Sequence, residues 1–403
     1  MTRLSPVAVR IVELAWADRV PSPAHDSLNP AERRAYLERH PDSFLAVDQT
    51  PDDLPETSVD DVLAGGRRAL ERLIDQGAFG AERPPYLYVY QLEQSRNGVV
   101  VHQQVGVVGG LAISRFDDGD LRPHELIHGE RAAHLGEHLG AIGVQSSPVA
   151  VAVRPGSGLG PLLERCRSEV GPPLVEAHGG NGLTQRIWAV KSTARTGQLV
   201  ALLAANSTYL IDGHHRAAAA ASRREPWLLS AVFPAEELAN RAFNRRIDGV
   251  NVRDVLALVG DRFAWREVDR ADLDRRDEDE VALTDSGHPD VGPWVVLRLP
   301  LGDDVLDRLD PVRIDRHLLG SVLGIDASQT DPRIAYHPAS AFAEPFERAS
   351  AAADQPSVLC IARPVSVETV LDLADAGRTL PPKSTYFEPK IPSGVFLHAA
   401  RRS

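Results

Sequence analysis

The sequence predicts a mixed α/β fold, and three observations support this class. Apolar runs of strand length occur among segments of helical periodicity. Asn97-Gly98 separates two β-rich runs within residues 84–113, which is a typical hairpin signal. The apolar strands at 183–191 and 208–212 are each followed by a helical pattern. Such an alternation favours a sheet covered by helices.

The elements follow in order along the chain. Asn29-Pro30 starts a short helix over 31–39, and apolar spacing predicts a second helix over 57–76. After the hairpin, we expect helices at 125–139, at 197–205 and from Gly213 onward, and strands at 148–153, 183–191, 208–212 and 227–233. The C-terminal portion contains the runs "WVVLRLP" and "PSVLCIARP", with predicted helices at 313–324 and 366–375.

Length and local composition predict a division into parts. A chain of 403 residues with 43% hydrophobic residues can form more than one lobe. Residues 266–290 are rich in charge and poor in apolar residues, which predicts an exposed connection. We therefore expect a main body at 1–265 and a C-terminal portion at 291–403.

Charge and cysteine content restrict the possible partners and compartment. The formal net charge of −12 argues against a broad nucleic-acid interface. Two cysteines, Cys166 and Cys360, cannot form a disulfide framework. The N-terminus has no signal-peptide pattern, and no apolar run reaches the roughly 20 residues of a membrane span. These features predict a cytoplasmic protein without membrane or nucleic-acid partners, and leave a homodimer open.

The most concentrated polar chemistry lies in "LIDGHHRAAAA", where a strand passes into a helix. Gly213 allows a sharp turn and close approach to a ligand. The first N–H groups of the helix favour an anion, and Arg216 has a planar fork that can bind phosphate oxygens. Asp212, at the strand end, is placed to orient a hydroxyl or hold a metal ion. An Asp cap with polar residues in the first helical turn is the structural alternative.

Four ordered blocks resemble the family known as domain of unknown function 1015. They are "VPSPAHDSLNPAERRAYLERHPDSFL", "YVYQLEQ" with "DGDLRPHE", "LIDGHHRAAAA" and "RTLPPKSTYFEPKIPSGVFL". Departures from the family pattern occur at Ala24, His25, His128, Ala217 and Asn244, and they indicate either a divergent substrate or weakened activity.

This family's Asp-Gly-His-His-Arg loop is similar to that of the ParB/sulfiredoxin-like superfamily. The resemblance implies a ParB/sulfiredoxin-like core with additional strands and helices and a C-terminal extension. It also implies nucleotide-dependent phosphoryl chemistry, since one branch with this loop phosphorylates free serine using ADP or ATP. We therefore expect a small-molecule kinase that uses ATP or ADP with Mg²⁺. A non-catalytic, nucleotide-binding regulator of the ParB type is the alternative.

The expected site residues come from these blocks. Asp212, Glu125 and His214 are the candidate catalytic residues, and the first two are also candidate Mg²⁺ ligands. Sequence does not decide which acid is the base. Asp26 and His124 are expected to bind substrate. The expected phosphate-binding residues are Gly213, His215, Arg216, Lys383, Ser384, Thr385 and Lys390.

"HELIHGERAAH" presents a competing pattern, the zincin H-E-x-x-H. On a helix, His124 and His128 would share a face and bind one zinc ion. However, Arg131 stands where metzincins have glycine, and the only methionine is Met1, so a Met-turn cannot form. A zinc hydrolase is therefore a remote alternative.

Overall fold

The computed structural model describes residues 4–113, 120–179, 182–285, 294–326, 331–339 and 355–401. It confirms the mixed α/β class and divides the chain into two compact units. Unit 1 comprises residues 1–238 and 389–403, and unit 2 comprises residues 239–388. Unit 2 is thus inserted between the body of unit 1 and its C-terminal segment. This division differs from the predicted one at 266–290.

Unit 1 is built on a large mixed sheet with the strand order β5-β10-β7-β11-β4-β3-β2-β20-β6. β1 pairs with β4, β9 with β3, and β8 with β9. The strands are β1 (Leu4–Ser5), β2 (Val7–Ile11), β3 (Arg83–Arg96), β4 (Val99–Ala112), β5 (Leu121–Arg122), β6 (Val144–Gln145), β7 (Val149–Val153), β8 (Val175–His178), β9 (Leu183–Val190), β10 (Thr208–Asp212), β11 (Trp227–Pro234) and β20 (Phe396–Ala399).

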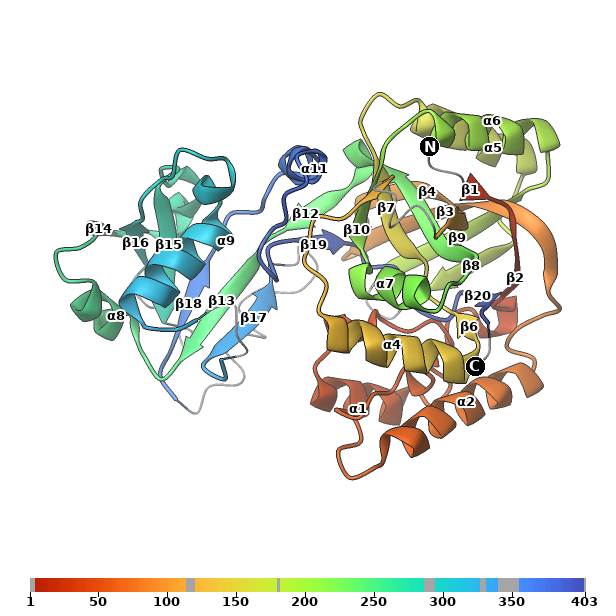
Figure 1. Ribbon diagram of the computed structural model, residues 1–403, viewed down its shortest axis with the longest axis horizontal. Coiled ribbons are helices and arrows are strands. Elements are labelled where there is room, and N and C mark those ends of the chain that lie inside the picture. Colours follow the sequence, from red (N-terminus) through yellow and green to blue (C-terminus); the bar gives the residue numbers. More distant parts are fainter. Residues whose placement is uncertain are drawn as a thin grey trace. The chain divides into compact units, whose positions relative to one another are not determined.

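Helices of unit 1 cover this sheet. They are α1 (Pro30–Arg39), α2 (Val59–Asp75), α4 (Gly129–Ile142), α5 (Leu159–Val170), α6 (Thr193–Ala204) and α7 (His214–Ser222). Figure 1 shows α4 and α7 side by side, while α5 and α6 form a separate pair. Apolar residues of the central strands pack with α5, α6 and α7 into one core, which includes Val151, Leu163, Leu203, Leu210 and Ala217. This packing fixes the ends of β7 and β10, where the polar residues lie.

The hairpin forms as the sequence predicts. β3 and β4 are joined at Asn97 and Gly98, whose φ values are +52° and +76°. Asparagine and glycine tolerate this left-handed backbone better than other residues, so they specify the turn. Strand β10 and helix α7 also confirm the predicted strand and helix on either side of Gly213.

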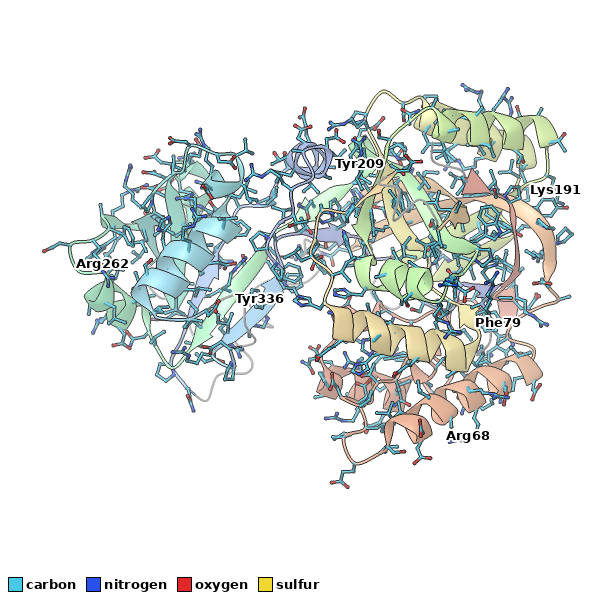
Figure 2. All side chains as sticks on the ribbon, viewed as in Figure 1. Arg68, Phe79, Lys191, Tyr209, Arg262 and Tyr336 are labelled. Atoms are coloured by element: carbon cyan, nitrogen blue, oxygen red, sulfur yellow. The ribbon has the colours of Figure 1, made fainter. Side chains whose placement is uncertain are left out.

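Unit 2 contains a six-stranded sheet with the order β14-β16-β15-β18-β13-β17 and a two-stranded ribbon of β12 and β19. Arg245 lies over the ring of Tyr336, which is labelled in Figure 2. The elements are β12 (Ala239–Arg241), β13 (Phe243–Asp248), α8 (Val252–Val259), β14 (Trp265–Val268), β15 (Glu280–Asp285), β16 (Trp294–Arg298), α9 (Asp310–Arg313), a π-helix (Ile314–Val322), β17 (Ile334–Pro338), β18 (Ser357–Ile361), α11 (Val367–Asp375) and β19 (Tyr386–Glu388).

The predicted exposed connection at 266–290 is wrong in part: residues 266–279 are largely exposed, but residues 280–284 are buried and the described segment lies inside unit 2. Residues 280–285 form β15, which pairs with β16 and β18 inside the sheet. Buried Glu280 accepts hydrogen bonds from Arg266 at 2.9 and 2.8 Å. The charges of this segment are therefore paired within a packed unit. Residues 286–290 lie outside the described residues.

Two further predictions concern the cysteines and the membrane-spanning helices. Cys166 and Cys360 are both buried free thiols, as expected of a chain without a disulfide framework. Within the described part of the chain, no helix is both apolar and long enough to cross a bilayer.

Candidate functional site

The junction between β10 and α7, residues 211–216, is called the seam below. It contains a bulge followed by a left-handed turn. The pairing of β10 with β7 shifts register between Leu210 and Asp212, so Ile211 is the extra residue. Gly213 then caps α7 with φ +92°. A Cβ on Gly213 would lie 2.7 Å from Val149 Cγ1, so only glycine fits this position without displacing the strand. The bulge and the turn together direct Asp212 and the start of α7.

Asp212 is held between two cations. Its Oδ2 accepts a hydrogen bond from Arg216 Nη2 at 2.8 Å. Its Oδ1 accepts from Lys390 Nζ, which reaches the seam from the C-terminal segment of unit 1. The structure therefore brings two of the predicted residues, separated by 178 positions, into direct contact.

The second terminal nitrogen of Arg216 is also occupied. Nη1 donates to the carbonyl and hydroxyl oxygens of Ser147, both at 2.8 Å, and to the carbonyl of Pro148 at 3.0 Å. These residues precede β7, the strand beside β10. The guanidinium that the sequence predicted to bind phosphate thus lies against a loop of its own unit.

The Pro-His-Glu block lies directly beside the seam. β5 pairs in parallel with β10, so both strands end at the same edge of the sheet. His124 Nδ1 donates to the carbonyl of Leu210 at 2.9 Å, and the main-chain N–H of His124 donates to His214 Nε2 at 3.4 Å. Farther along, the main-chain N–H of His128 donates to His215 Nε2 at 3.2 Å, and the two rings stack. These contacts join two family blocks that are about 90 residues apart in the chain.

These contacts also explain why one predicted helix starts late. The sequence predicted a helix from Glu125, whereas α4 begins at Gly129. Residues 123–128 are non-helical because they follow the edge of β10 and pair with the turn. His124 and His128 therefore do not share a helix face, and no group of three or more potential metal ligands occurs among the described residues. The zincin interpretation loses its geometric basis.

Burial determines the protonation of the two central histidines. It lowers the pKa of His124 to about 4, and it lowers the pKa of His214 well below 6.5, with nearby cations adding to the effect. Both imidazoles are thus neutral at neutral pH. Because His214 Nε2 accepts a hydrogen bond, its proton is assigned to Nδ1, which lies 3.9 Å from Glu125 Oε2. His214 therefore presents its N–H toward Glu125.

The N-terminal and C-terminal blocks meet next to this cluster. Ser22 and Ser393 exchange main-chain hydrogen bonds of 3.0 and 3.1 Å. The N–H of Gly394 donates to the carbonyl of Ser146 at 3.0 Å. Lys390 precedes this junction by three residues, and Ser146 adjoins the serine that holds Arg216. All four family blocks thus contribute to one region of unit 1.

The N-terminal block contains the predicted substrate residue Asp26 and, next to it, His25. His25 Nε2 lies 3.5 Å from Asp53 Oδ2, and burial lowers the pKa of His25. Asp53 also accepts a 2.6 Å hydrogen bond from buried Arg33. The side chain of Asp26 lies outside the described residues. Its role in substrate binding stays a prediction.

Three of the predicted phosphate-binding residues belong to unit 2: Lys383, Ser384 and Thr385. Ser384 is buried and its hydroxyl donates to the carbonyl of Pro381 at 2.8 Å. Lys383 Nζ lies 5.1 Å from the ring centroid of Phe243. The predicted role of Lys383, Ser384 and Thr385 in phosphate binding stays a prediction.

Sequence reasoning missed the Ser147–Pro148 loop and the Arg33–Asp53 pair. Two of the three oxygens that hold Arg216 are main-chain carbonyls, for which side-chain chemistry gives no signal. Arg33 and Asp53 are separated by 20 residues across a predicted helix and a proline-rich stretch. Only their proximity in the fold identifies them.

The family model for a protein of unknown function (DUF1015) matches residues 6–284, more than half of the chain. The chain belongs to the DUF1015 family. The match includes three of the four blocks, and the DUF1015 seam residues 212–216 lie well inside it. No protein with a curated description matches the sequence.

Solved structures that resemble this DUF1015 chain are distant. A free serine kinase in complex with AMP gives a TM-score of 0.40 at 15% identity and covers 73% of this chain and 91% of its own. SbnI with a C-terminal truncation from Staphylococcus aureus gives 0.38 at 11%, covering 71% and 85%. A conserved hypothetical protein from Pyrococcus furiosus gives 0.37 at 14%, covering 73% and 95%. Because these TM-scores are low, we base the function on the contacts of the chain's own residues.

Proposed function

We propose that this protein is a nucleotide-dependent phosphotransferase that acts on the hydroxyl group of a small metabolite. The supporting observation is that Lys390 contacts Asp212 beside the N-terminus of α7, the helix that begins directly after Gly213. This arrangement combines an anion-binding helix end, a cation and a carboxylate. Phosphoryl transfer depends mainly on positioning and charge neutralisation, for which these groups are suited.

The N-terminus of α7 is the proposed phosphate-binding element. Its first turn contains no acidic residue, and Gly213 provides no side-chain cap. Helix N-termini attract anions through their N–H groups and their dipole. α4 begins at the same sheet edge, with His128 as an N-cap whose side chain makes no capping hydrogen bond. We propose that the main-chain N–H groups of His214 and His215, with Lys390, bind nucleotide phosphates.

Asp212 and Glu125 are the proposed acids of the reaction. One accepts the proton of the acceptor hydroxyl while the hydroxyl oxygen forms a bond to the terminal phosphorus of the nucleotide. The bond from that phosphorus to the bridging oxygen breaks, and the departing nucleotide keeps the electron pair. His214 is neutral and lies 3.9 Å from Glu125, and it is the proposed positioning partner of that acid.

The donor set is compatible with Mg²⁺. This ion usually binds one or two protein carboxylates and completes its coordination with phosphate oxygens and water. Asp212 and Glu125 are the two carboxylates at this seam. When bound, Mg²⁺ would neutralise charge on the transferred phosphoryl group.

The proposed acceptor is serine or a serine-like amino acid, and the proposed donor is ATP or ADP. Both follow from the resemblance of the Asp-Gly-His-His-Arg loop to the serine-phosphorylating branch of its superfamily. We place Asp26 and His124 near the acceptor as part of this proposal. A regulator that binds nucleotide without turnover is the alternative that the experiment must separate.

The experiment incubates the protein with ATP or ADP, Mg²⁺ and a panel of hydroxy amino acids, and detects phosphorylated product by ³¹P NMR. We expect product with the wild type and its loss in Asp212→Asn and Lys390→Met. Lys191→Met is the matched control, because Lys191 is an exposed lysine of the same unit and is labelled in Figure 2. Nucleotide binding without product would favour the regulator, and absence of nucleotide binding would refute both.

A further inference from the structure

The guanidinium of Arg216 is committed to protein oxygens on two sides. Nη2 donates to Asp212 Oδ2, and Nη1 donates to two oxygens of Ser147 and to the carbonyl of Pro148, all within 2.8–3.0 Å. We infer that Arg216 is a positioning residue that fixes Asp212 against the Ser147–Pro148 loop, and that it is not a phosphate ligand. This inference rests on the proposed function, because it names how Asp212, one of the two proposed acids, is held.

Leaving these partners would be costly for Arg216. A phosphate contact through Nη1 would withdraw hydrogen bonds from three oxygens at once. Ser147 is half-buried and Pro148 is buried, so the carbonyl of Pro148 in particular would lose a charged donor in a buried residue. The planar fork of arginine suits this fixed, multiple contact.

The loop that receives Arg216 is itself anchored. The carbonyl of Ser146 accepts from the N–H of Gly394, and the loop runs directly into β7 between β10 and β11. Ser393 pairs in turn with Ser22. Arg216 therefore connects Asp212 to a frame that three separate chain segments build.

Lys390 differs from Arg216 in the chemistry it offers. Its ammonium group is a point charge on a flexible stem, and its donors can rotate toward a new acceptor. Such a group can move from Asp212 to an arriving phosphate, whereas Arg216 retains its orientation. Of the two cations that contact Asp212, Lys390 thus binds phosphate and Arg216 positions the carboxylate.

The test measures kcat and the ADP dissociation constant separately for Arg216→Lys, Ser147→Ala and Lys390→Met. Lysine retains the charge but not the fork, so Arg216→Lys should lower kcat about tenfold or more and leave ADP affinity within about threefold. Ser147→Ala removes one of four hydrogen bonds and should lower kcat by a smaller factor. Lys390→Met should instead weaken ADP binding at least about tenfold.

Ser222→Ala is the matched control, since Ser222 lies at the other end of α7 and its hydroxyl donates to the carbonyl of Ala219 in the same helix. The inference is overturned if Arg216→Lys weakens ADP binding as strongly as Lys390→Met while kcat is retained. Should Arg216→Lys fail to fold, Ser147→Ala decides by the same criterion, because its hydroxyl acts on the site through Arg216.

A second readout does not depend on activity. The urea unfolding midpoints of Asp212→Asn, Arg216→Lys and the double variant form a double-mutant cycle. Positioning predicts that the losses are not additive, because each substitution breaks the same contact. Additive losses would refute the positioning role. If the wild type binds no nucleotide, the proposed function fails, but this cycle still decides the role of Arg216.

Discussion

Each unit contains a carboxylate surrounded by cations, and the two clusters differ at the adjoining helix. In unit 1, Asp212 precedes α7, whose first turn has neither an acid nor a side-chain cap. In unit 2, Asp310 is itself the first residue of α9 and lies inside that helix's first turn. The positive end of α9 is therefore compensated by its own chain, whereas that of α7 is suited to an external anion.

The arginines of unit 2, like Arg216 of unit 1, bind main-chain carbonyls. Arg313 donates to the carbonyls of Glu278, Asp279, Leu299 and Pro300, besides Asp310. Arg363 likewise donates to four carbonyls within residues 276–280. These hydrogen bonds tie loops together within one unit. A buried ionic cluster is thus no sign of a functional site unless its geometry leaves a place for a ligand.

The largest expected effect concerns the acid of unit 1. Asp212→Asn should reduce phosphoryl transfer by about 10²–10⁴-fold, the usual range for loss of an acid–base group. Its unfolding free energy should fall by less than the about 3–5 kcal/mol lost when a fully buried pair is broken, since the Asp212 side chain is 19% exposed. Turnover assays and urea unfolding measure the two quantities. Asp75→Asn, an exposed acid at the end of α2, is the control, and equal loss of activity in both variants would contradict the assignment.

The acid of unit 2 should show the opposite behaviour. Asp310→Ala leaves Arg313, Arg276 and Arg363 without their shared carboxylate, and breaking a buried pair costs about 3–5 kcal/mol. We expect a loss of this size in urea unfolding. Asp307→Ala, which removes a half-buried partner of exposed Arg316, should cost less than ~1 kcal/mol. Similar losses in both variants would show that the Asp310 cluster is not a structural core element.

Two glycines that cap helices in unit 1 sharpen the difference between a shaped site and an ordinary turn. Gly213→Ala combines left-handed backbone strain with a contact of 2.7 Å to Val149, and should cost about 2–4 kcal/mol of unfolding free energy. Gly158 caps α5 with φ +84°, but its nearest neighbour is 3.8 Å away, so Gly158→Ala should cost only ~1 kcal/mol. Equal thermal stabilities of the two variants would argue against close packing around the seam.

The smallest expected effect is a pH dependence of stability. The pKa of His124 is about 4 in the folded protein, below its ordinary value of 6.5. As the pH falls, His124 therefore becomes protonated in the unfolded chain at a higher pH than in the folded protein. Stability from this group is complete above pH 6.5 and is lost as the pH falls toward 4. From pH 8 to pH 5 the loss is roughly 2 kcal/mol.

Urea unfolding at several pH values tests this slope. His124→Asn should flatten it relative to the wild type, while His134→Asn, at an exposed position of α4, should leave it unchanged. A wild-type slope retained in His124→Asn would mean that the buried histidine does not titrate as described.

Much of the seam could be predicted because its signals are local. Gly213 before an alanine-rich helix and Asn97-Gly98 between β-rich runs specify their turns through backbone conformation alone. Matching family blocks also indicated that Lys390 belongs with Asp212. These predictions depend on short sequence patterns, which tertiary contacts did not override.

The failures came from contacts that no local pattern reports. Residues 125–128 have helical periodicity, but hydrogen bonds to His214 and His215 draw the chain along β10. Charge density made 266–290 resemble an exposed linker, whereas Arg266 pairs with Glu280 inside a sheet. The contacts of Arg216 with Ser147 span 69 positions and use one main-chain and one hydroxyl oxygen, and a further contact uses the main-chain oxygen of Pro148.

The most direct test of the central claim is a crystal structure with bound ADP and Mg²⁺. We predict that the terminal phosphate lies within hydrogen-bond distance of the main-chain N–H of His214 and of Lys390 Nζ, while Arg216 remains on Ser147. A nucleotide bound away from the N-terminus of α7, with Lys390 still on Asp212, would contradict the account.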